Sequence, residues 1–246
     1  MTNKLRLDKY LYDNQYAESR NKAQQLILDS KVKVNNKIIN KPNFLVSNDD
    51  NINIISNLEF VSRGGLKLES AIKHFQINMK DKIVLDIGAS TGGFTDCCIK
   101  NGAKIVYALD VGTNQLHYSL LSNPKVINLP NTNFKKIPDI FHNINIDVFV
   151  VDVSFISLKN VFEVLMPIFK KEQILICLIK PQFELNKAII TKNKGCIKSP
   201  KLHNQAINNV LKSANEYNFK LVNIIESPIK GAKGENKEFL AMFKIF

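Results

Sequence analysis

The chain has 246 residues, of which 45% are hydrophobic, and it carries a formal net charge of +12 with a pI near 9.4. This length and hydrophobic content fit a folded protein with a sizeable core, in one large domain or two unequal ones. No apolar run is long enough to span a bilayer and no apolar signal core stands at the start, so we expect a cytoplasmic protein. The positive charge favours a polyanionic partner.

Cysteine and arginine positions refine this picture. The chain has four cysteines, whose spacing matches no metal site: Cys97, Cys98, Cys177 and Cys196. Reduced thiols and the absence of a bound metal are the expectation. The three arginines all lie in the first quarter of the chain: Arg6, Arg20 and Arg63. Because arginine is suited to bidentate phosphate contacts, this part is expected to face nucleic acid.

The first 60 residues predict a small helix-helix-hairpin unit. Leu7 and Leu11 are spaced for one face of a helix, and Ser19 is a suitable cap for a second. Two alternating runs flank Asn35-Asn36, which indicates a hairpin, and residues 52–55 form one more strand. Residues 1–41 contain nine Lys and Arg against four Asp and Glu. The unit suits RNA docking, although a structural module with a solvated basic face fits the same pattern.

Residues 62–65 mark a boundary before a periodic helix at 66–75, and strands then alternate with helices. Strands are predicted at 82–86, 104–109, 125–129, 146–152 and 173–180, with 219–226 and 238–245 closing the sheet. Helices are predicted near 93–101, 114–122, 157–170 and 201–217. This alternation is typical of a doubly wound α/β sheet. The two closing strands leave no room for a helix between them, so they are expected to pair as a hairpin.

The segment 82–96 predicts a ligand-binding turn between the first strand and the first helix of this sheet. Gly88 and Gly93 match a dinucleotide fingerprint, but Ser90 replaces the glycine that lets a pyrophosphate approach. S-adenosylmethionine, which has an adenosine and no pyrophosphate, fits better than NAD. Asp110 ends the next strand, where an acidic side chain can bind a ribose diol. A glycine-rich turn that binds no ligand is the alternative.

Two charged residues end strands that are otherwise apolar. Asp152 follows Ile146–Val151, and Lys180 follows Ile174–Ile179. Both strand ends are expected at the same edge of the sheet as the loop after Asp86. A lysine beside a carboxylate at this edge suits acid–base chemistry, while a structural ion pair explains the same residues.

Ordered motifs along nearly the whole chain resemble the TlyA (haemolysin A) family of ribosomal RNA 2′-O-methyltransferases. They run through L-D-K-Y-L from Leu7, A-E-S-R from Ala17, V-x-V-N from Val32, F-V-S-R-G-G-L-K-L-E from Phe60, D-I-G-A-S-T-G-G-F-T-D from Asp86, D-V-G-T-N-Q-L-H from Asp110, D-V-S-F-I-S-L from Asp152, I-K-P-Q-F-E from Ile179 and E-F-L from Glu238. The resemblance implies an RNA-binding domain similar to that of ribosomal protein S-four at 1–61. It implies an FtsJ-like, Rossmann-like methyltransferase domain at 62–246, with helices on both faces of the sheet.

The same resemblance implies a catalytic tetrad, which falls on Lys67, Asp152, Lys180 and Glu238. The expected reaction moves a methyl group from S-adenosylmethionine to a ribose 2′-hydroxyl, that of a cytidine, in ribosomal RNA. Lys180 would take the hydroxyl proton, Asp152 and Lys67 would orient Lys180, and Glu238 would hold the ribose or a tetrad lysine.

Two further sets of residues complete the expected site. The cofactor-binding residues are Asp86, Gly88, Ser90, Gly92, Gly93, Phe94, Asp110 and Asn133. The RNA-binding residues are Arg6, Lys9, Arg20, Lys22, Lys33 and Arg63. Gly88 and Gly92 are expected to let the methionine part of the cofactor pass close to the backbone.

Three rival functions were compared with this one. Methylation of an exocyclic amine places a proline pair after the fourth strand, where this chain has Asp152-Val153-Ser154-Phe155, and no nucleophilic cysteine for carbon methylation follows that strand. A membrane-lytic protein needs a long amphipathic or spanning helix. A ribosome-assembly factor without catalysis stays open, although the complete tetrad argues against it.

Overall fold

A computed structural model describes residues 4–17, 19–55, 59–231 and 236–246 of the chain. It divides into two compact units, Met1–Arg63 and Gly64–Phe246. This division falls two residues beyond the boundary expected from the sequence. Glu18, part of one quoted motif, lies outside the described residues.

The first unit packs two helices on short strands. Its elements are β1 (Leu5–Arg6), α1 (Leu7–Asp13), α2 (Arg20–Leu28), β2 (Val32–Val34), β3 (Lys37–Ile38), β4 (Leu45–Val46) and β5 (Ile52–Ile54). Both predicted helices, the hairpin and the later strand are confirmed. Ser19 caps α2, since its hydroxyl accepts a hydrogen bond from the backbone N–H of Lys22. Asn35 and Asn36 adopt φ of 50° and 65°, the left-handed conformation that a two-residue hairpin turn requires.

The second unit alternates strands and helices as predicted. Its strands are β6 (Ile83–Ile87), β7 (Ile105–Leu109), β8 (Val126–Leu129), β9 (Val148–Val151), β10 (Ile174–Ile179), β11 (Lys220–Glu226) and β12 (Phe239–Lys244). Its main helices are α3 (Gly64–His74), α4 (Gly93–Lys100), α5 (Tyr118–Leu121), α7 (Leu158–Leu165) and α10 (Pro200–Glu216).

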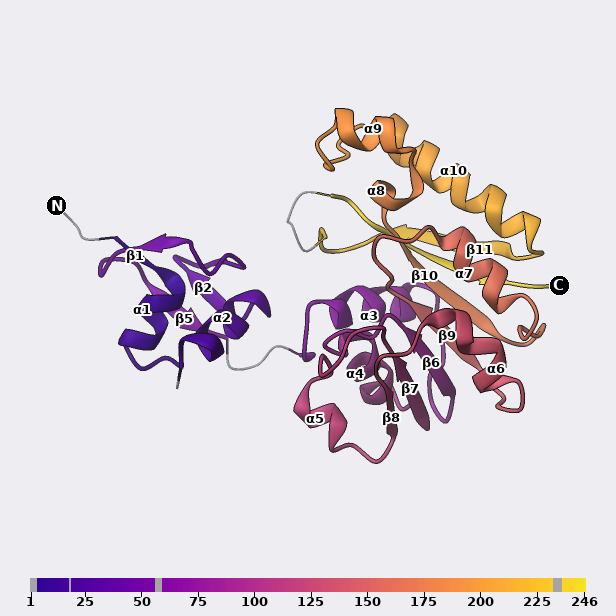
Figure 1. The fold of residues 1–246 in the computed structure, drawn as a ribbon, viewed down its shortest axis with the longest axis horizontal. Coiled ribbons are helices and arrows are strands. Elements are labelled where there is room, and N and C mark those ends of the chain that lie inside the picture. Colours follow the sequence, from indigo (N-terminus) through magenta and orange to yellow (C-terminus); the bar gives the residue numbers. More distant parts are fainter. Residues whose placement is uncertain (1–3, 18, 56–58, 232–235) are drawn as a thin grey trace. The chain divides into compact units, whose positions relative to one another are not determined.

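These strands form one sheet in the order β11-β12-β10-β9-β6-β7-β8 (Figure 1). β10, β9, β6, β7 and β8 run parallel, whereas β12 is antiparallel to both of its neighbours. The predicted closing hairpin of β11 and β12 is therefore confirmed. It also inserts β12 beside β10, which brings the start of β12 to the edge where the parallel strands end.

Helices cover both faces of this sheet (Figure 1). On β6, Leu85 and Ile87 belong to a core shared with Val161 and Phe162 of α7. The intervening Asp86 points to the other face, where it contacts Thr95 of α4, as the alternation of side chains along a strand requires.

Several short helices have no counterpart in the prediction. They are η1 (Phe134–Lys136), α6 (Ile137–Phe141), α8 (Pro181–Glu184) and α9 (Lys187–Lys192). Helices of three to six residues span at most two turns, so hydrophobic periodicity gives them little signal.

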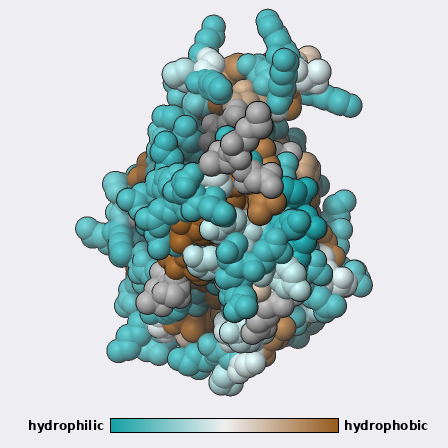
Figure 2. Space-filling view, turned by 90° about the vertical axis from the view of Figure 1, so that its left-hand side faces the viewer, coloured by the Kyte–Doolittle hydropathy of each residue, from teal (hydrophilic) through white to brown (hydrophobic). Residues whose placement is uncertain are grey.

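One face of the molecule is mainly hydrophilic, with hydrophobic side chains visible in patches between polar ones (Figure 2). Within the described ranges, no helix combines the length and the hydropathy needed to cross a bilayer.

Candidate active site at the carboxyl edge of the sheet

The strand order brings the predicted site residues to one edge. β6 lies between β9 and β7, and β10 lies between β9 and β12. The loops that follow β6, β7, β9 and β10 therefore leave the sheet side by side, at the edge where ligands of open α/β sheets bind.

Lys180 and Asp152 form an ion pair at this edge. The Nζ atom of Lys180 lies 2.6 Å from an Asp152 carboxylate oxygen and donates a hydrogen bond of 2.9 Å to the Ser154 hydroxyl. Lys180 is buried, while Asp152 is partly exposed. The sequence prediction that these two strand ends meet is confirmed. Ser154 is an additional partner that only the folded loop reveals.

Lys67 and Glu238 form a second ion pair, which is buried. The Nζ atom of Lys67 donates a hydrogen bond of 2.6 Å to Oε2 of Glu238. A Cβ atom on Gly231 would lie 2.6 Å from Oε1 of Glu238, so the absence of a side chain there leaves room for the carboxylate.

Sheet register connects the two pairs. Ile179 of β10 lies opposite Phe239 of antiparallel β12. Lys180 directly follows Ile179 and Glu238 directly precedes Phe239, so continuing the antiparallel register by one step would set Lys180 opposite Glu238. The four residues of the expected tetrad thus gather at one place. One role differs from the expectation: Lys67 pairs with Glu238, whereas Asp152 and Ser154 are the partners of Lys180.

The glycines of the loop after β6 serve the protein's own packing. Gly88 has φ of +87°, and a Cβ atom there would lie 2.8 Å from the carbonyl oxygen of Asp152. Gly92 has φ of +93°, and its Cβ atom would strike Leu120 and Leu116. Positive φ and contact with neighbouring segments account for glycine at both positions. The expectation that they also let a ligand pass close to the backbone stays a prediction.

Asp110 organises the same loop from the end of β7. Its carboxylate accepts hydrogen bonds of 2.8 Å from the Ser90 backbone N–H and 2.7 Å from that of Gly112. A carboxylate offers about four lone-pair positions. Asp110 therefore keeps acceptor capacity for the hydroxyl groups of a ribose.

Asp86 lies beneath this loop and is fully buried. Its Oδ2 atom accepts a 2.7 Å hydrogen bond from the Thr95 hydroxyl, and its Oδ1 atom has no hydrogen-bond partner within the described structure. Burial, aided by the nearby charges of Asp152 and Asp110, raises the pKa of Asp86 to about 7. Because it is fully buried, the Asp86 side chain offers no exposed surface to a ligand.

The electrostatics of this edge favour a cationic ligand. Asp86, Asp110 and Asp152 end three strands and are close enough for Asp86 to sense the charge of the other two. The partly exposed carboxylate of Asp110 would repel a pyrophosphate and attract a sulfonium. The donor set therefore fits S-adenosylmethionine better than NAD.

The remaining expected cofactor residues differ in accessibility. Gly93 and Phe94 are buried at the start of α4, while Ser90 is exposed. Asn133 is exposed, and its side-chain oxygen accepts a hydrogen bond from the Lys135 backbone N–H at the start of η1. Ser90 and Asn133 are the members of this set whose side chains reach solvent most fully.

Glu184 is a site residue that sequence reasoning missed. It ends α8 just after Lys180, and its two carboxylate oxygens accept hydrogen bonds from the Ser157 hydroxyl at 2.8 Å and the Leu158 backbone N–H at 2.9 Å. Burial raises the pKa of Glu184. This carboxylate joins the loop after β10 to the loop after β9. Its partners lie 26 and 27 residues away in the sequence, so no local sequence pattern predicts these hydrogen bonds.

Phe155 is a second missed residue. It lies in the Asp152 loop, is 86% exposed, and adopts φ of +65°. A bulky side chain in the left-handed region is a conformational outlier, which the surrounding structure must hold in place. Its ring lies 5.1 Å from the ring of Phe183, which in turn lies 5.9 Å from Nζ of Lys180.

The candidate RNA-binding residues all belong to the first unit, Met1–Arg63. The exposed members are Arg6, Lys9, Arg20 and Lys22, and the partly exposed members are Lys33 and Arg63. Among the described residues, no group of three or more His, Cys, Asp and Glu is placed to hold a metal ion.

Two family profiles match the chain. A profile described as FtsJ-like methyltransferase matches residues 60–244, and one described as S4 domain matches residues 5–52.

Full-length relatives agree with these matches. Hemolysin A of Brachyspira hyodysenteriae is 43% identical over 242 residues, which cover 98% of this chain and 100% of the relative. The 16S/23S rRNA (cytidine-2′-O)-methyltransferase TlyA of Mycobacterium tuberculosis is 34% identical over 242 residues, which cover 98% of this chain and 90% of the relative. A solved structure from Streptococcus thermophilus, described as a candidate hemolysin, is 35% identical with a TM-score of 0.76, and the match covers 100% of this chain and 90% of that one.

The buried Asp86 predicts a pH-dependent stability. Its pKa rises from an ordinary value of 3.8 to about 7, so between these values the folded chain holds a proton that the unfolded chain has lost. The free energy of unfolding should therefore fall with rising pH across this window, by up to about 1.4 kcal/mol per pH unit, and level off above it. Asp86→Asn removes the titrating group, so its stability relative to the unmodified chain should be greater at pH 8 than at pH 5 in urea unfolding.

Asp139→Asn is the matched control, because Asp139 is an exposed carboxylate of α6. An equal stability difference at both pH values for Asp86→Asn would contradict the assignment.

Proposed function

The chain belongs to the FtsJ-like methyltransferase family, and we propose that it transfers a methyl group from S-adenosylmethionine to the ribose 2′-hydroxyl of a cytidine in ribosomal RNA. The observation that carries this proposal is the pairing of Lys180 with Asp152 and of Lys67 with Glu238 at the carboxyl edge of the sheet. The name of the Mycobacterium tuberculosis relative supports the choice of nucleotide and substrate.

When bound, S-adenosylmethionine supplies an electrophilic methyl group on a sulfonium centre. The residues that would hold it are Asp110, through the ribose, and the loop from Gly88 to Gly93. Asp110 fixes this loop through the Ser90 N–H, so ribose binding and loop geometry depend on the same carboxylate. Asp86 beneath the loop favours the cation above neutral pH, where a carboxyl group with a pKa of about 7 is ionised.

The nucleophile is the harder problem, because a ribose hydroxyl holds its proton tightly. Lys180, once neutral, accepts this proton while the oxygen attacks the methyl carbon. Asp152 and Ser154 fix the direction of the Lys180 side chain through contacts of 2.6 and 2.9 Å. Glu238, held by Lys67, lies opposite Lys180 in the sheet register and can accept a hydrogen bond from the ribose.

Phe155 offers the substrate base an aromatic surface. Sequence-specific RNA enzymes act on unstacked bases, which stack on exposed aromatic side chains. The ring of Phe155 is exposed in the loop that carries Asp152, and Phe183 supports it. A base stacked there would have its ribose near Lys180.

The two units divide the work in this proposal. Residues 1–61 bind RNA and residues 62–246 carry the chemistry. A ribosomal substrate places the reaction in the cytoplasm. A ribosome-assembly factor without catalysis is the alternative, and mapping of 2′-O-methylation on ribosomal RNA incubated with the protein and S-adenosylmethionine separates the two.

Replacing the proposed base should abolish most turnover without weakening cofactor binding. Lys180→Met keeps the length of the side chain and removes the amine. Its single-turnover rate on ribosomal RNA should fall by roughly 10²–10⁴-fold, the range for acid–base catalysis, while calorimetry shows S-adenosylmethionine affinity near that of the unmodified chain.

Lys125→Met is the matched control, since Lys125 is exposed and precedes β8 at the opposite edge of the sheet. Near-normal single-turnover rates for Lys180→Met would show that another group accepts the hydroxyl proton.

Removing the Glu184 carboxylate should slow catalysis because the loop that carries Asp152 is no longer held in position. Glu184→Ala loses both hydrogen bonds between the two site loops, which we expect to cost about 1.5–3 kcal/mol of stability. Because the Asp152 loop loses its anchor, kcat should fall at least tenfold with a smaller change in S-adenosylmethionine affinity. Glu163→Ala, which removes an exposed carboxylate of α7, is the control. Equal kcat in the two variants would refute the positioning role.

Truncating the exposed ring should weaken RNA recognition. Phe155→Ala should raise KM for ribosomal RNA by an amount that corresponds to about 1–3 kcal/mol, the value of one base–aromatic stack. Phe246→Ala is a suitable control, because Phe246 is 80% exposed and follows β12 at the opposite edge of the sheet. An unchanged KM for Phe155→Ala would show that the base binds elsewhere.

A further inference from the structure

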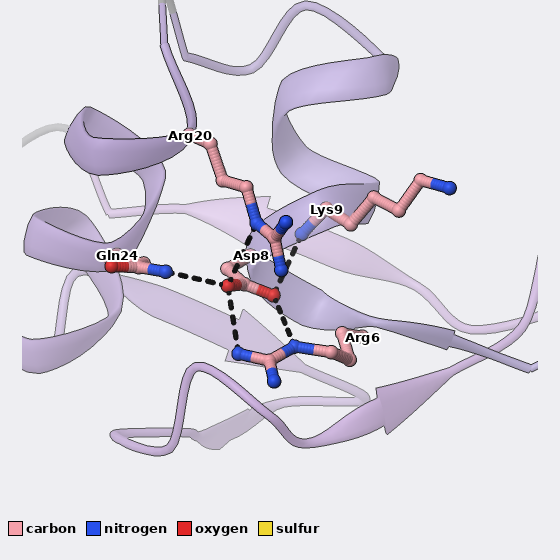
Figure 3. Close-up of polar contacts among 5 residues, drawn as sticks. All are labelled: Arg6, Asp8, Lys9, Arg20 and Gln24. Carbon is pink, nitrogen blue, oxygen red and sulfur yellow. Dashed lines mark hydrogen bonds and ion pairs between the residues drawn. The ribbon is translucent and has the colours of Figure 1, made fainter.

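Asp8 is a buried carboxylate at the centre of the positively charged part of the first unit (Figure 3). It is 0% exposed and accepts hydrogen bonds through both oxygens. Arg6 approaches in bidentate fashion, with Nε and NH2 each at 3.0 Å. Arg20 donates from Nε at 3.2 Å and Gln24 from its amide at 2.8 Å. The backbone N–H of Lys9 completes the set at 3.0 Å.

The two arginines are held by Asp8 but remain accessible. The side chains of Arg6 and Arg20 are 47% and 49% exposed. Arg6 contacts Asp8 through Nε and Nη2, and Arg20 contacts it through Nε. The NH1 group of Arg6 and both terminal nitrogens of Arg20 are thus left without a bond to Asp8, and they are available to a further acceptor.

The charge of Asp8 is well secured. Burial alone would raise its pKa, but hydrogen bonds from Arg6, Gln24 and Arg20 outweigh burial and hold the pKa well below its usual range. The carboxylate is therefore ionised at any pH at which the protein works, and it orients both guanidinium groups permanently.

Fixed orientation matters because arginine is a flexible side chain. Immobilising one rotamer-rich side chain on binding costs about 0.5–1.5 kcal/mol. In the folded chain Arg6 and Arg20 are already held by Asp8, so an incoming anion meets two guanidinium groups whose orientation is set. The guanidinium group matches the geometry of phosphate oxygens, and those of Arg6 and Arg20, which flank the Asp8 carboxylate, each keep donors for a phosphate (Figure 3).

We propose that Asp8 is a positioning residue that presents Arg6 and Arg20 as a paired binding site for a backbone phosphate of RNA. This inference rests on the proposed function, because it assigns the phosphate to the RNA substrate. Asp8 itself does not contact the RNA.

A purely structural role for Asp8, that of joining α1 to α2, makes a different prediction. Asp8→Asn removes a negative charge from a basic surface. If Asp8 only joined the helices, a folded Asp8→Asn variant would bind RNA more tightly, because its net charge is more positive. If Asp8 orients the arginines, the same variant binds RNA less tightly in spite of its added charge. The two roles thus differ in the sign of the effect.

The experiment measures binding of the full chain to a ribosomal RNA transcript at several salt concentrations, without S-adenosylmethionine. Asp13→Asn is the matched control, because Asp13 is an exposed aspartate of α1 and its replacement changes the charge equally. We expect Kd to rise about 10- to 100-fold for Asp8→Asn, the effect of losing charged hydrogen bonds, and to stay equal or fall for Asp13→Asn. Equal or tighter binding by folded Asp8→Asn would overturn the proposal.

Arg20→Lys gives a second test in which Asp8 keeps its bonds to Arg6 and Gln24. Lysine keeps the positive charge but lacks the planar guanidinium group. Kd for RNA should therefore rise, while the slope of log Kd against log salt concentration stays the same. Unchanged affinity in Arg20→Lys would count against the paired site, even if Asp8→Asn fails to fold. An unmodified chain that binds ribosomal RNA but methylates no ribose would overturn the proposed function and leave this inference standing. An unmodified chain that binds no ribosomal RNA would overturn both.

Discussion

A lysine buried at the edge of a β-sheet requires a carboxylate beside it, and this requirement shapes the whole candidate site. Withdrawing an ammonium group from water costs several kcal/mol unless an anion compensates. Lys180 and Lys67 are both buried, and each has a carboxylate oxygen at 2.6 Å. Because β10 lies between β9 and β12, Lys180 meets Asp152 on one side and comes opposite Glu238 on the other. Strand order, rather than local sequence, gathers these charges.

Stability alone does not explain why two ion pairs occupy this place. Replacing a buried ion pair with well-packed apolar residues is often neutral or stabilising, so such pairs are weak evidence for a structural purpose. Here the pairs lie where the loops of four neighbouring strands leave the sheet, and Asp152 is partly open to solvent. A pair of this kind holds a lysine in one orientation beside solvent. The acid–base role proposed for Lys180 therefore explains the arrangement better than stability does.

The sequence predicted the parts of this site that have a local signal. Asp152 and Lys180 each follow an apolar run, and the expected meeting of these strand ends is confirmed by a contact of 2.6 Å. The pairing of Lys67 with Glu238 depends on a register between residues 171 positions apart, which periodicity cannot supply. At Gly88 the sequence showed the glycine but not one reason for it, because the atom that excludes a side chain there belongs to Asp152, a residue that only the fold brings close.

Three carboxylates explain most of what the sequence could not reveal. Asp8, Asp110 and Glu184 each accept hydrogen bonds from groups that lie up to 16, 20 and 27 residues away. An acidic residue in a sequence gives no sign of such partners, and the usual interpretation is an exposed charge. In the folded chain each one holds part of a proposed site: an arginine pair, the loop after β6, or the loop after β9. Folding thus bears the entropic cost of orienting these groups before any substrate arrives, which is the condition under which electrostatic preorganisation can accelerate a reaction.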